Sequence, residues 1–255
     1  MIELVLIGMG TGNPEHLTLQ AVRVLRSADL VLLPRKGDEK TDLADARRGI
    51  CAEFLERTDP VVEFDLPVRD ATGNYLDGVA DWHDAIAATW GRLIKQHRPH
   101  GGRVALLVWG DPSLYDSSLR IAERLAVQGI VANVTVVPGL TSLQLLTAAH
   151  AIPLNTVGAP VQLTTGRRLR EEGWPAGVDS VAVFLDGGCA FDTLPPDGLY
   201  IYWGAYLGMP QEICRAGFVA DVGEEIIEVR AAAREKHGWI MDVYLLRRMA
   251  EASTA

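Results

Sequence analysis

Several loops of this sequence combine glycine with small hydroxyl or carboxylate side chains, and each follows an apolar run. Three lie in the first half: GMGTGNP (8–14), WGDPSLYDSS (109–118) and PGLTSLQ (138–144). FLDGG (184–188) and YWGAYLG (202–208) repeat the pattern in the second half. Glycine lets the backbone approach a ligand closely, and a few polar groups can orient that ligand. Gly-Asp-Pro and Pro-Gly alone are typical of turns, but five such loops favour a small-molecule site.

The first loop departs from the glycine pattern that binds dinucleotides, G-x-G-x-x-G. Gly8 and Gly10 match its first two glycines, but the third position is Asn13. The acidic residue expected about 20 residues further on is missing, because the next apolar run ends in Pro34. No loop has the order of a P-loop, and none contains lysine, so a triphosphate ligand is disfavoured.

The composition also favours a small-molecule ligand. The chain has 255 residues, of which 48% are hydrophobic, and a formal net charge of −9. Proteins that bind nucleic acid normally carry a basic face, so no nucleic-acid partner is expected. No apolar run reaches the roughly 18 to 20 residues of a membrane span, and the start lacks the features of a signal peptide. We therefore expect a cytoplasmic protein with no membrane partner.

The cysteines and histidines do not predict a metal site. Cys51, Cys189 and Cys214 are far apart and outside any C-x-x-C, so we expect buried thiols rather than disulfides or a zinc site. His97 and His100 lie three residues apart in KQHRPHGG, but the proline between them disrupts a helical ligand arrangement. We interpret this segment as a solvated loop.

The first 150 residues alternate apolar runs with amphipathic segments, which is typical of a parallel sheet covered on both faces. Asn13 and Pro14 suit the cap and first position of a helix. Ligands of doubly wound sheets lie beyond the carboxyl ends of the strands, where the three loops are expected. The predicted strands are 2–8, 28–34, 61–67, 103–110 and 133–139. The predicted helices are 15–27, 42–57, 78–98, 116–128 and 141–149.

HAIPLNTVGAP (150–160) interrupts this pattern and is interpreted as a linker. We place a boundary near residue 156, giving domains 1–156 and 157–255. Strands predicted beyond it are 161–166, 180–188, 198–204, 224–230 and 239–248, with helices at 167–175 and 209–217. So few helices favour a mixed or mostly antiparallel sheet. The expected fold class is α/β, with two α/β domains and an inter-domain cleft.

The motifs GMGTGNPEHLT, GDPSLY and VPGLTS, followed by an IPL linker and a strand closing in TTG, resemble the tetrapyrrole methylase family. The resemblance covers nearly the whole chain. It implies a first domain with a doubly wound, mostly parallel sheet and a second with a mixed sheet. It also implies S-adenosylmethionine as methyl donor, S-adenosylhomocysteine as product, a small-molecule tetrapyrrole substrate and a homodimer.

Within the family, PEHLTLQAVRVLRSADLVLLPRKGDEKTDL (14–43) most resembles the branch that methylates precorrin-5 at C-1 and releases its acetyl group as acetate. The alternatives are methylation at another ring position and the branch that modifies a histidine of a translation factor, the diphthine-type methylases. From other classes, a dinucleotide-dependent reductase and a non-catalytic binding module also stay open.

The resemblance assigns the polar loops to the two ligands, with no metal ion. The cofactor-binding residues that it implies are Thr11, Trp109, Gly110, Asp111, Ser113, Leu114, Thr141, Ser142, Leu185, Asp186, Gly204 and Ala205. The substrate-binding residues are Gly10, Gly12, Pro14, Arg35, Lys36 and Arg167. The sequence departs from the family pattern where Gly10-Thr11-Gly12-Asn13 replaces Gly-Pro-Gly-Asp, Thr165-Gly166-Arg167 replaces Thr-Gly-His, and Asp186 replaces a common methionine.

A substrate with several carboxylates needs local positive charge on a chain of net charge −9. Arginine suits carboxylates because it can donate two parallel hydrogen bonds. The candidates are Arg35, Lys36, Lys40, Arg47 and Arg48, and, in the second domain, Arg167, Arg168 and Arg170. For Arg47 and Arg48 the alternative is a solvated helix face.

Loss of an acetyl group requires water to attack the acetyl carbonyl, and a general base would assist that step. The titratable groups in the loops are His16, Asp111, Tyr115 and Asp186. The sequence does not choose among these four catalytic candidates. For Asp111 the alternative is a turn residue that caps the following helix.

Overall fold

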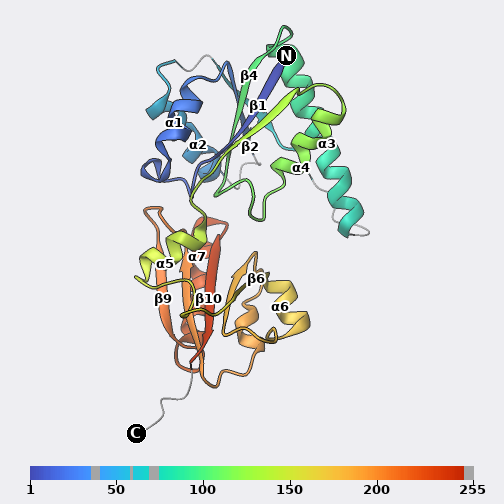
Figure 1. The fold of residues 1–255 in the computed structure, drawn as a ribbon. Helices are drawn as coiled ribbons and strands as arrows, with labels where there is room; N and C mark the ends of the chain where they lie inside the picture. The colour runs from blue at the N-terminus through green and yellow to red at the C-terminus, as the bar shows by residue number, and fades with distance from the viewer. Residues whose placement is uncertain (36–40, 58–59, 69–74, 250–255) are drawn as a thin grey trace. The chain divides into compact units, whose positions relative to one another are not determined.

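The computed structural model describes residues 1–35, 41–57, 60–68 and 75–249. Contacts divide the chain into two compact units, Met1–Thr141 (unit 1) and Ser142–Ala255 (unit 2). Each unit contains one five-stranded sheet (Figure 1). The prediction of two α/β sheets is therefore confirmed.

Unit 1 is built on a parallel sheet with the order β3-β2-β4-β1-β5, and every pairing in it is parallel. Its strands are β1 (Ile2–Gly8), β2 (Leu30–Arg35), β3 (Val61–Asp65), β4 (Gly102–Val108) and β5 (Asn133–Val137). Its helices are α1 (Leu19–Arg26), α2 (Thr41–Phe54), α3 (Tyr75–His97) and α4 (Ser118–Val127). The first and fourth strands lie side by side although about a hundred residues separate them, as the register Ile2 to Gly102 shows.

Helices cover both faces of this sheet, as the near-continuous apolar strands predict. Side chains alternate along a strand, so Leu4 and Leu6 of β1 pack in a core with α3 and α4. Val5 and Ile7 point to the other face and pack with α1 and α2. Figure 1 shows these two helix pairs on opposite sides of the sheet.

The chain after β1 forms a short turn before its helix begins. Asn13 caps this 3-10 turn, Pro14–His16, by accepting a hydrogen bond from the Glu15 amide at 3.0 Å. Thr18 then caps α1 through the Ala21 amide, also at 3.0 Å. The predicted helix 15–27 therefore begins at Leu19, because two caps in succession divide the segment.

Unit 2 is built on a mixed sheet with the order β6-β7-β10-β8-β9. Only β6 and β7 pair in parallel, and the other pairings are antiparallel. Its strands are β6 (Val161–Thr165), β7 (Ser180–Phe184), β8 (Leu199–Ala205), β9 (Ile213–Phe218) and β10 (Asp242–Arg248). Its helices are α5 (Ser142–Ala149), α6 (Gly166–Glu172), the 3-10 helix η3 (Ala190–Thr193) and α7 (Val219–His237).

Two predicted elements of unit 2 are wrong. The predicted strand 224–230 lies inside α7, and the predicted helix 209–217 mostly precedes or forms β9. The short motif EEIIEVR resembles a strand, but the buried residues of α7 recur every three or four positions, which is the spacing of one helix face. Those residues are Val219, Gly223, Ile226, Arg230 and Ala233. Strand β9 is an edge strand whose residues are only partly buried or exposed, so its sequence lacks an apolar alternation.

The segment after α5 is anchored to unit 2. The Arg247 guanidinium of β10 donates to the carbonyl oxygens of Pro153 and Leu154 at 2.9 and 3.0 Å. Helix α5 packs against β10 and β8 of unit 2. It therefore belongs to unit 2, which begins at Ser142. The domain boundary near residue 156 stays a prediction.

The cysteines mostly lie as expected. Cys51 and Cys189 are buried, whereas Cys214 is partly exposed because it lies on the edge strand β9. His97 ends α3, and both it and His100 are exposed. Among the described residues, no group of three or more His, Cys, Asp or Glu side chains is arranged as metal ligands. In the same ranges, no helix combines the length and apolar character needed to cross a membrane.

Candidate functional site

The three polar loops of unit 1 follow strands that are direct neighbours in the sheet. Because β4, β1 and β5 are adjacent and parallel, their carboxyl ends lie at one edge. Gly10 and Gly110 join the first two loops by a short antiparallel bridge, with N···O distances of 3.3 and 2.7 Å. The structure therefore brings the loops together as the sequence predicts.

Glycines allow these loops to pack backbone against backbone. A Cβ atom on Gly139 would overlap the Gly110 carbonyl oxygen and lie 2.7 Å from the Gly8 Cα. A Cβ on Gly8 would lie 2.5 Å from the Gly139 nitrogen. Each loop contributes one member of this contact, and a side chain at Gly8 or Gly139 would push the loops apart.

Asp111 ties the second loop to the third. One carboxylate oxygen accepts from the Ser113 amide and hydroxyl at 2.8 and 2.5 Å, and the other accepts from the Gly139 amide at 2.8 Å. Burial raises the pKa of this carboxyl, but these hydrogen bonds outweigh it and hold the pKa below its usual value. Asp111 is therefore ionised at neutral pH and engaged in holding two loops.

Two other catalytic candidates lie at the same loops: His16 follows the first loop, and Tyr115 is part of the second. A Cβ on Gly10 would lie 2.9 Å from the His16 Cβ, so the histidine packs directly over the first loop. The His16 Nδ1 atom is buried and has no hydrogen-bond partner among the residues that the structure describes. Tyr115 is 43% exposed and has a left-handed backbone, with φ of 50°, which is a strained conformation for tyrosine.

The remaining unit 1 candidates pack around this edge. Thr11 is buried, and a Cβ on Gly12 would lie 3.1 Å from the Trp109 ring and 3.2 Å from the Ala46 Cβ of α2. Leu114 closes a turn on Asp111 by donating its amide to the Asp111 carbonyl at 3.2 Å. Pro14 begins the 3-10 turn, and Thr141 ends the third loop.

The arginines near this edge differ in how their charge is compensated. Arg35 is exposed and pairs with Asp65 at 3.1 Å, and Arg48 pairs with Glu63 at 2.7 Å. Arg47 instead donates to two backbone carbonyls, those of Leu107 and Leu43, both at 3.0 Å. Lys36 and Lys40 lie outside the described residues.

The sequence did not single out Arg47 from its neighbour, yet its environment is distinct. It has no carboxylate within ion-pair distance in the part of the chain that the structure describes. Burial lowers its pKa to about 10, and the more distant Asp116 carboxylate only partly offsets that effect. A partly buried cation of this kind gains from an incoming anion.

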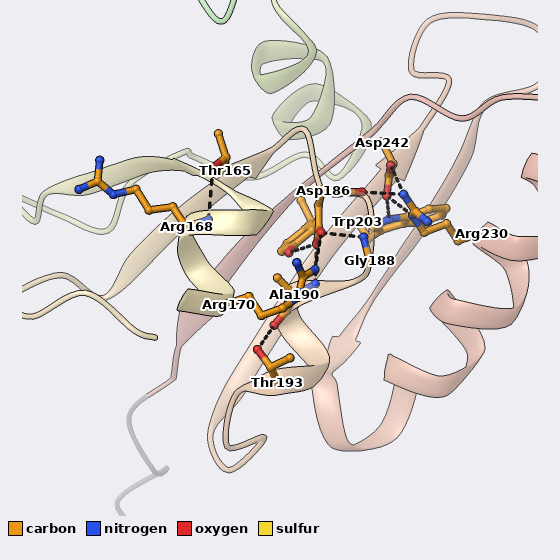
Figure 2. Close-up of polar contacts among 11 residues, drawn as sticks. Thr165, Arg168, Arg170, Asp186, Gly188, Ala190, Thr193, Trp203, Arg230 and Asp242 are labelled. Atoms are coloured by element: carbon orange, nitrogen blue, oxygen red, sulfur yellow. Dashed lines mark hydrogen bonds and ion pairs between the residues drawn. The ribbon is translucent and has the colours of Figure 1, made fainter. Parts of the chain in front are cut away.

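In unit 2, Asp186 lies at the centre of a buried polar network (Figure 2). Its Oδ1 accepts from the Gly188 amide at 3.0 Å and from Arg170 at 3.1 Å. Its Oδ2 accepts from the Ala190 amide at 2.5 Å and the Tyr244 hydroxyl at 2.6 Å. Burial raises the pKa of the carboxyl, but the hydrogen bonds outweigh it and lower the pKa. The carboxylate is thus ionised, and each oxygen already accepts two hydrogen bonds.

Arg230 of α7 extends this network to a second carboxylate. It donates to Asp242 at 2.8 Å and to the Asp186 carbonyl oxygen at 2.6 Å. Trp203 also donates its ring N–H to Asp242, at 3.0 Å. The Arg230 and Asp242 side chains are only 10% and 6% exposed, so the ion pair is buried. Sequence reasoning missed this pair because it assigned Arg230 to a strand.

The other unit 2 candidates surround the network. Leu185 is 69% exposed, and Ala205, which pairs with Asp242 in register, is buried. A Cβ on Gly204 would contact Leu207 and Leu146, and one on Gly166 would overlap the Asp186 carboxylate. Ser142 begins α5, and Arg167 is exposed in α6.

Thr165 caps α6 by accepting from the Arg168 amide at 3.4 Å (Figure 2). Arg168 pairs with Glu172 at 2.8 Å on the same exposed helix face. In the same group of arginines, Arg170 reaches the buried carboxylate of Asp186 at 3.1 Å.

Comparison with known proteins gives one consistent result. Residues 3–222 match the family described as tetrapyrrole (corrin/porphyrin) methylases. The chain is 50% identical over 254 residues to precorrin-6A synthase [deacetylating] from a Sinorhizobium species, and the alignment covers 98% of this chain and 97% of that protein.

Solved structures agree with this likeness. A cobalamin synthesis related protein (CobF) from Corynebacterium diphtheriae is 38% identical, with a TM-score of 0.84 over 98% of this chain and 100% of that chain. The cobalt precorrin-4 methyltransferase CbiF is 18% identical, with a TM-score of 0.62 over 96% of this chain and 94% of that one. The second likeness concerns the fold alone.

Proposed function

Because this chain belongs to the tetrapyrrole methylase family, we propose that it is an S-adenosylmethionine-dependent C-methyltransferase of cobalamin biosynthesis. It methylates precorrin-5 at C-1 and releases the acetyl group as acetate, giving precorrin-6A. The observation that carries this proposal is the near-complete alignment with the Sinorhizobium enzyme, which extends through both units. The cobalamin biosynthesis protein CobIJ of Mycobacterium bovis and a uroporphyrinogen III methyltransferase of Arabidopsis thaliana align over less of this chain and at lower identity.

The polar loops of unit 1 fit S-adenosylmethionine. Gly8, Gly110 and Gly139 bring three backbones into contact without intervening side chains, as a closely bound nucleoside or amino-acid group requires. Hydroxyl groups of Thr11, Ser113 and Thr141, on these same loops, suit its polar atoms. When bound, the sulfonium supplies a reactive methyl group.

The residues of these loops then act mainly by orientation. Once the acetyl group has left, C-1 is an electron-rich carbon that can take the methyl group itself, so no covalent nucleophile is required. Positioning of reactants can contribute about 7 to 11 kcal/mol in favourable cases. The ties that fix the loops, Gly10 to Gly110 and Asp111 to Gly139, suit this role.

His16 is the best supported general base for deacetylation. The Asp186 oxygens already accept four hydrogen bonds, and Asp111 is held by Ser113 and Gly139, with the pKa of both carboxyls lowered. His16 instead has a buried Nδ1 without a partner in the described ranges. Buried polar atoms seldom stay unpaired unless a ligand or function needs them.

Arg47 is the best supported anchor for a substrate carboxylate. Arg35 and Arg48 already pair with carboxylates on β3, so their charge is compensated. Arg47 donates to carbonyl oxygens only, and its neighbour Ala46 packs beside the Gly12 position of the first loop.

Replacing Arg47 by glutamine is expected to raise the KM for the tetrapyrrole at least about tenfold, because hydrogen bonds to charged groups contribute about 1.5–3 kcal/mol. The variant should also show a weaker dependence of KM on salt than the wild type. Steady-state kinetics at two ionic strengths measures both quantities. Arg26→Gln is the matched control, since Arg26 also donates to a helix carbonyl, that of Phe54, at 2.9 Å. Equal effects of the two substitutions would refute the assignment.

Calorimetry separates this function from a dinucleotide-dependent reductase. The protein is expected to bind S-adenosylhomocysteine and to show no comparable affinity for NADP. Tight binding of NADP without binding of the thioether would contradict the methyltransferase assignment.

A homodimeric state and residence in the cytoplasm are further proposals, and both rest on the family resemblance. Light scattering coupled to size exclusion tests the first. A mass of one chain, 27.7 kDa, would contradict it.

A further inference from the structure

Leu185 has an unusual conformation for an exposed apolar residue. It directly follows β7, the residue is 69% exposed, and its backbone is left-handed, with φ of 50°. This conformation is unfavourable for leucine, because the Cβ atom crowds the backbone. Such strain persists only where surrounding structure enforces it, and it concentrates at ligand sites.

The next residue, Asp186, supplies the constraint. Its carboxylate is 2% exposed and accepts hydrogen bonds from β10 through Tyr244, from α6 through Arg170, and from the Gly188 and Ala190 amides of its own loop. Its carbonyl oxygen accepts from Arg230 of α7 at 2.6 Å. Both the side chain and the backbone of Asp186 are therefore fixed, as Figure 2 shows for Arg170, Arg230 and the loop amides.

The loop cannot relax around this anchor. Gly166 has no room for a side chain, because a Cβ there would overlap the Asp186 carboxylate. A Cβ on Gly188 would lie 2.9 Å from the Arg170 guanidinium. With Asp186 enclosed on these sides, Leu185 keeps its left-handed backbone and presents its side chain outward.

We propose that Tyr244, Arg170 and Arg230 are positioning residues that act through Asp186 to hold Leu185 against the nucleoside portion of the methyl donor. This inference rests on the proposed methyltransferase function. An apolar side chain on a fixed backbone suits the flat face of a purine, and its prior ordering reduces the entropy lost on binding.

Leu185→Ala tests the contact itself. The substitution is expected to raise the Kd for S-adenosylhomocysteine about fivefold, the loss that follows when about 1 kcal/mol of buried apolar contact is removed. The melting temperature should stay the same, because Leu185 is 69% exposed.

Tyr244→Phe tests the positioning. It removes one donor to Asp186 and keeps the ring that packs edge-on against Phe191. The Kd for S-adenosylhomocysteine is expected to rise by at most about fivefold, because Tyr244 acts only through Leu185 and the Leu185 contact itself contributes about that much. In kinetics the KM for S-adenosylmethionine should rise while the KM for the tetrapyrrole stays constant.

The double variant distinguishes action through Leu185 from general damage. If Tyr244 acts through Leu185, the combined loss of affinity is smaller than the product of the single losses. Trp174→Phe is the control, since Trp174 donates to the Val178 carbonyl at 3.1 Å, before β7 and away from the Asp186 loop. It should lower the melting temperature without changing the Kd.

The outcomes separate this inference from the proposed function. Independent, multiplicative losses in the double variant, or an unchanged Kd in Tyr244→Phe, would overturn the positioning role while leaving the methyltransferase assignment intact. A wild-type protein that does not bind S-adenosylhomocysteine at all would instead contradict the proposed function.

Discussion

A protein in which His16 is replaced by alanine is expected to bind S-adenosylhomocysteine normally but to release acetate about 10²- to 10⁴-fold more slowly, the range for loss of a general base. In the proposed step, the base takes a proton from water as the water oxygen attacks the acetyl carbonyl. The bond between C-1 and the acetyl carbon then breaks, which releases the acetyl group as acetate, and its electron pair makes C-1 the nucleophile that takes the methyl group from the sulfonium. Product mass and released acetate, followed together, measure the effect.

C-1 has three ring bonds besides its bond to the acetyl group, so it can accept a methyl group only once the acetyl group has left. His16→Ala is therefore expected to slow methyl transfer to C-1 together with acetate release, and an unchanged Kd for S-adenosylhomocysteine separates the loss of a base from the loss of donor binding. His100→Ala is the control, because His100 is an exposed loop residue in unit 1. Coupled methylation and acetate release at the wild-type rate in His16→Ala would contradict the assignment.

Replacement of Arg230 by methionine is expected to lower the free energy of unfolding of unit 2 by about 3–5 kcal/mol, the usual cost of breaking a buried ion pair. The reason is that Asp242, with its side chain 6% exposed, would keep its charge without its main partner. The Asp186 carbonyl would also lose its Arg230 donor. Native-state hydrogen exchange of the β8 and β10 amides measures this free energy within unit 2.

Arg215→Met provides the matched control for Arg230→Met. Arg215 pairs with Glu225 at 2.6 Å, but the two side chains are 37% and 52% exposed. Exposed pairs contribute about 0–1 kcal/mol, so this substitution should have a small effect. Similar losses for the two variants would show that the buried network does not stabilise unit 2 in the way described.

The parallel sheet of unit 1 could be predicted because its signals are local. Buried parallel strands form near-continuous apolar runs, and the loops at their carboxyl ends follow directly in the sequence. Gly10 and Gly110 lie close together because they follow β1 and β4, which are neighbours in the sheet. Both glycines therefore lie at the carboxyl-end edge of the sheet, where a ligand is expected.

The network of unit 2 could not be predicted because its partners are distant in sequence. Tyr244 and Asp186 are 58 residues apart, and Arg230 and Asp186 are 44 apart. The wrong prediction of a strand at 224–230 also hid the role of Arg230. A strand there would place Arg230 on a sheet, whereas it lies on the face of α7 that packs inward. Short segments such as EEIIEVR fit both periods, and only the packing of α7 against β9 and β8 decides between them.

The distinction between Arg47 and Arg48 likewise required tertiary structure. Adjacent helix positions point in different directions, so one arginine reaches Glu63 on β3 while the other reaches the Leu107 carbonyl of β4. The sequence identifies both as candidates for carboxylate binding, whereas the pairing of Arg48 leaves Arg47 as the stronger one.

Incubation of the protein with precorrin-5 and methyl-labelled S-adenosylmethionine tests the central claim most directly. We expect one labelled methyl group in the tetrapyrrole product for each acetate released, with the product mass reduced by the acetyl group and increased by the methyl group. Transfer of the label without release of acetate, or no transfer to precorrin-5 by protein that binds S-adenosylhomocysteine, would contradict the assignment of this chain to deacetylating methylation at C-1.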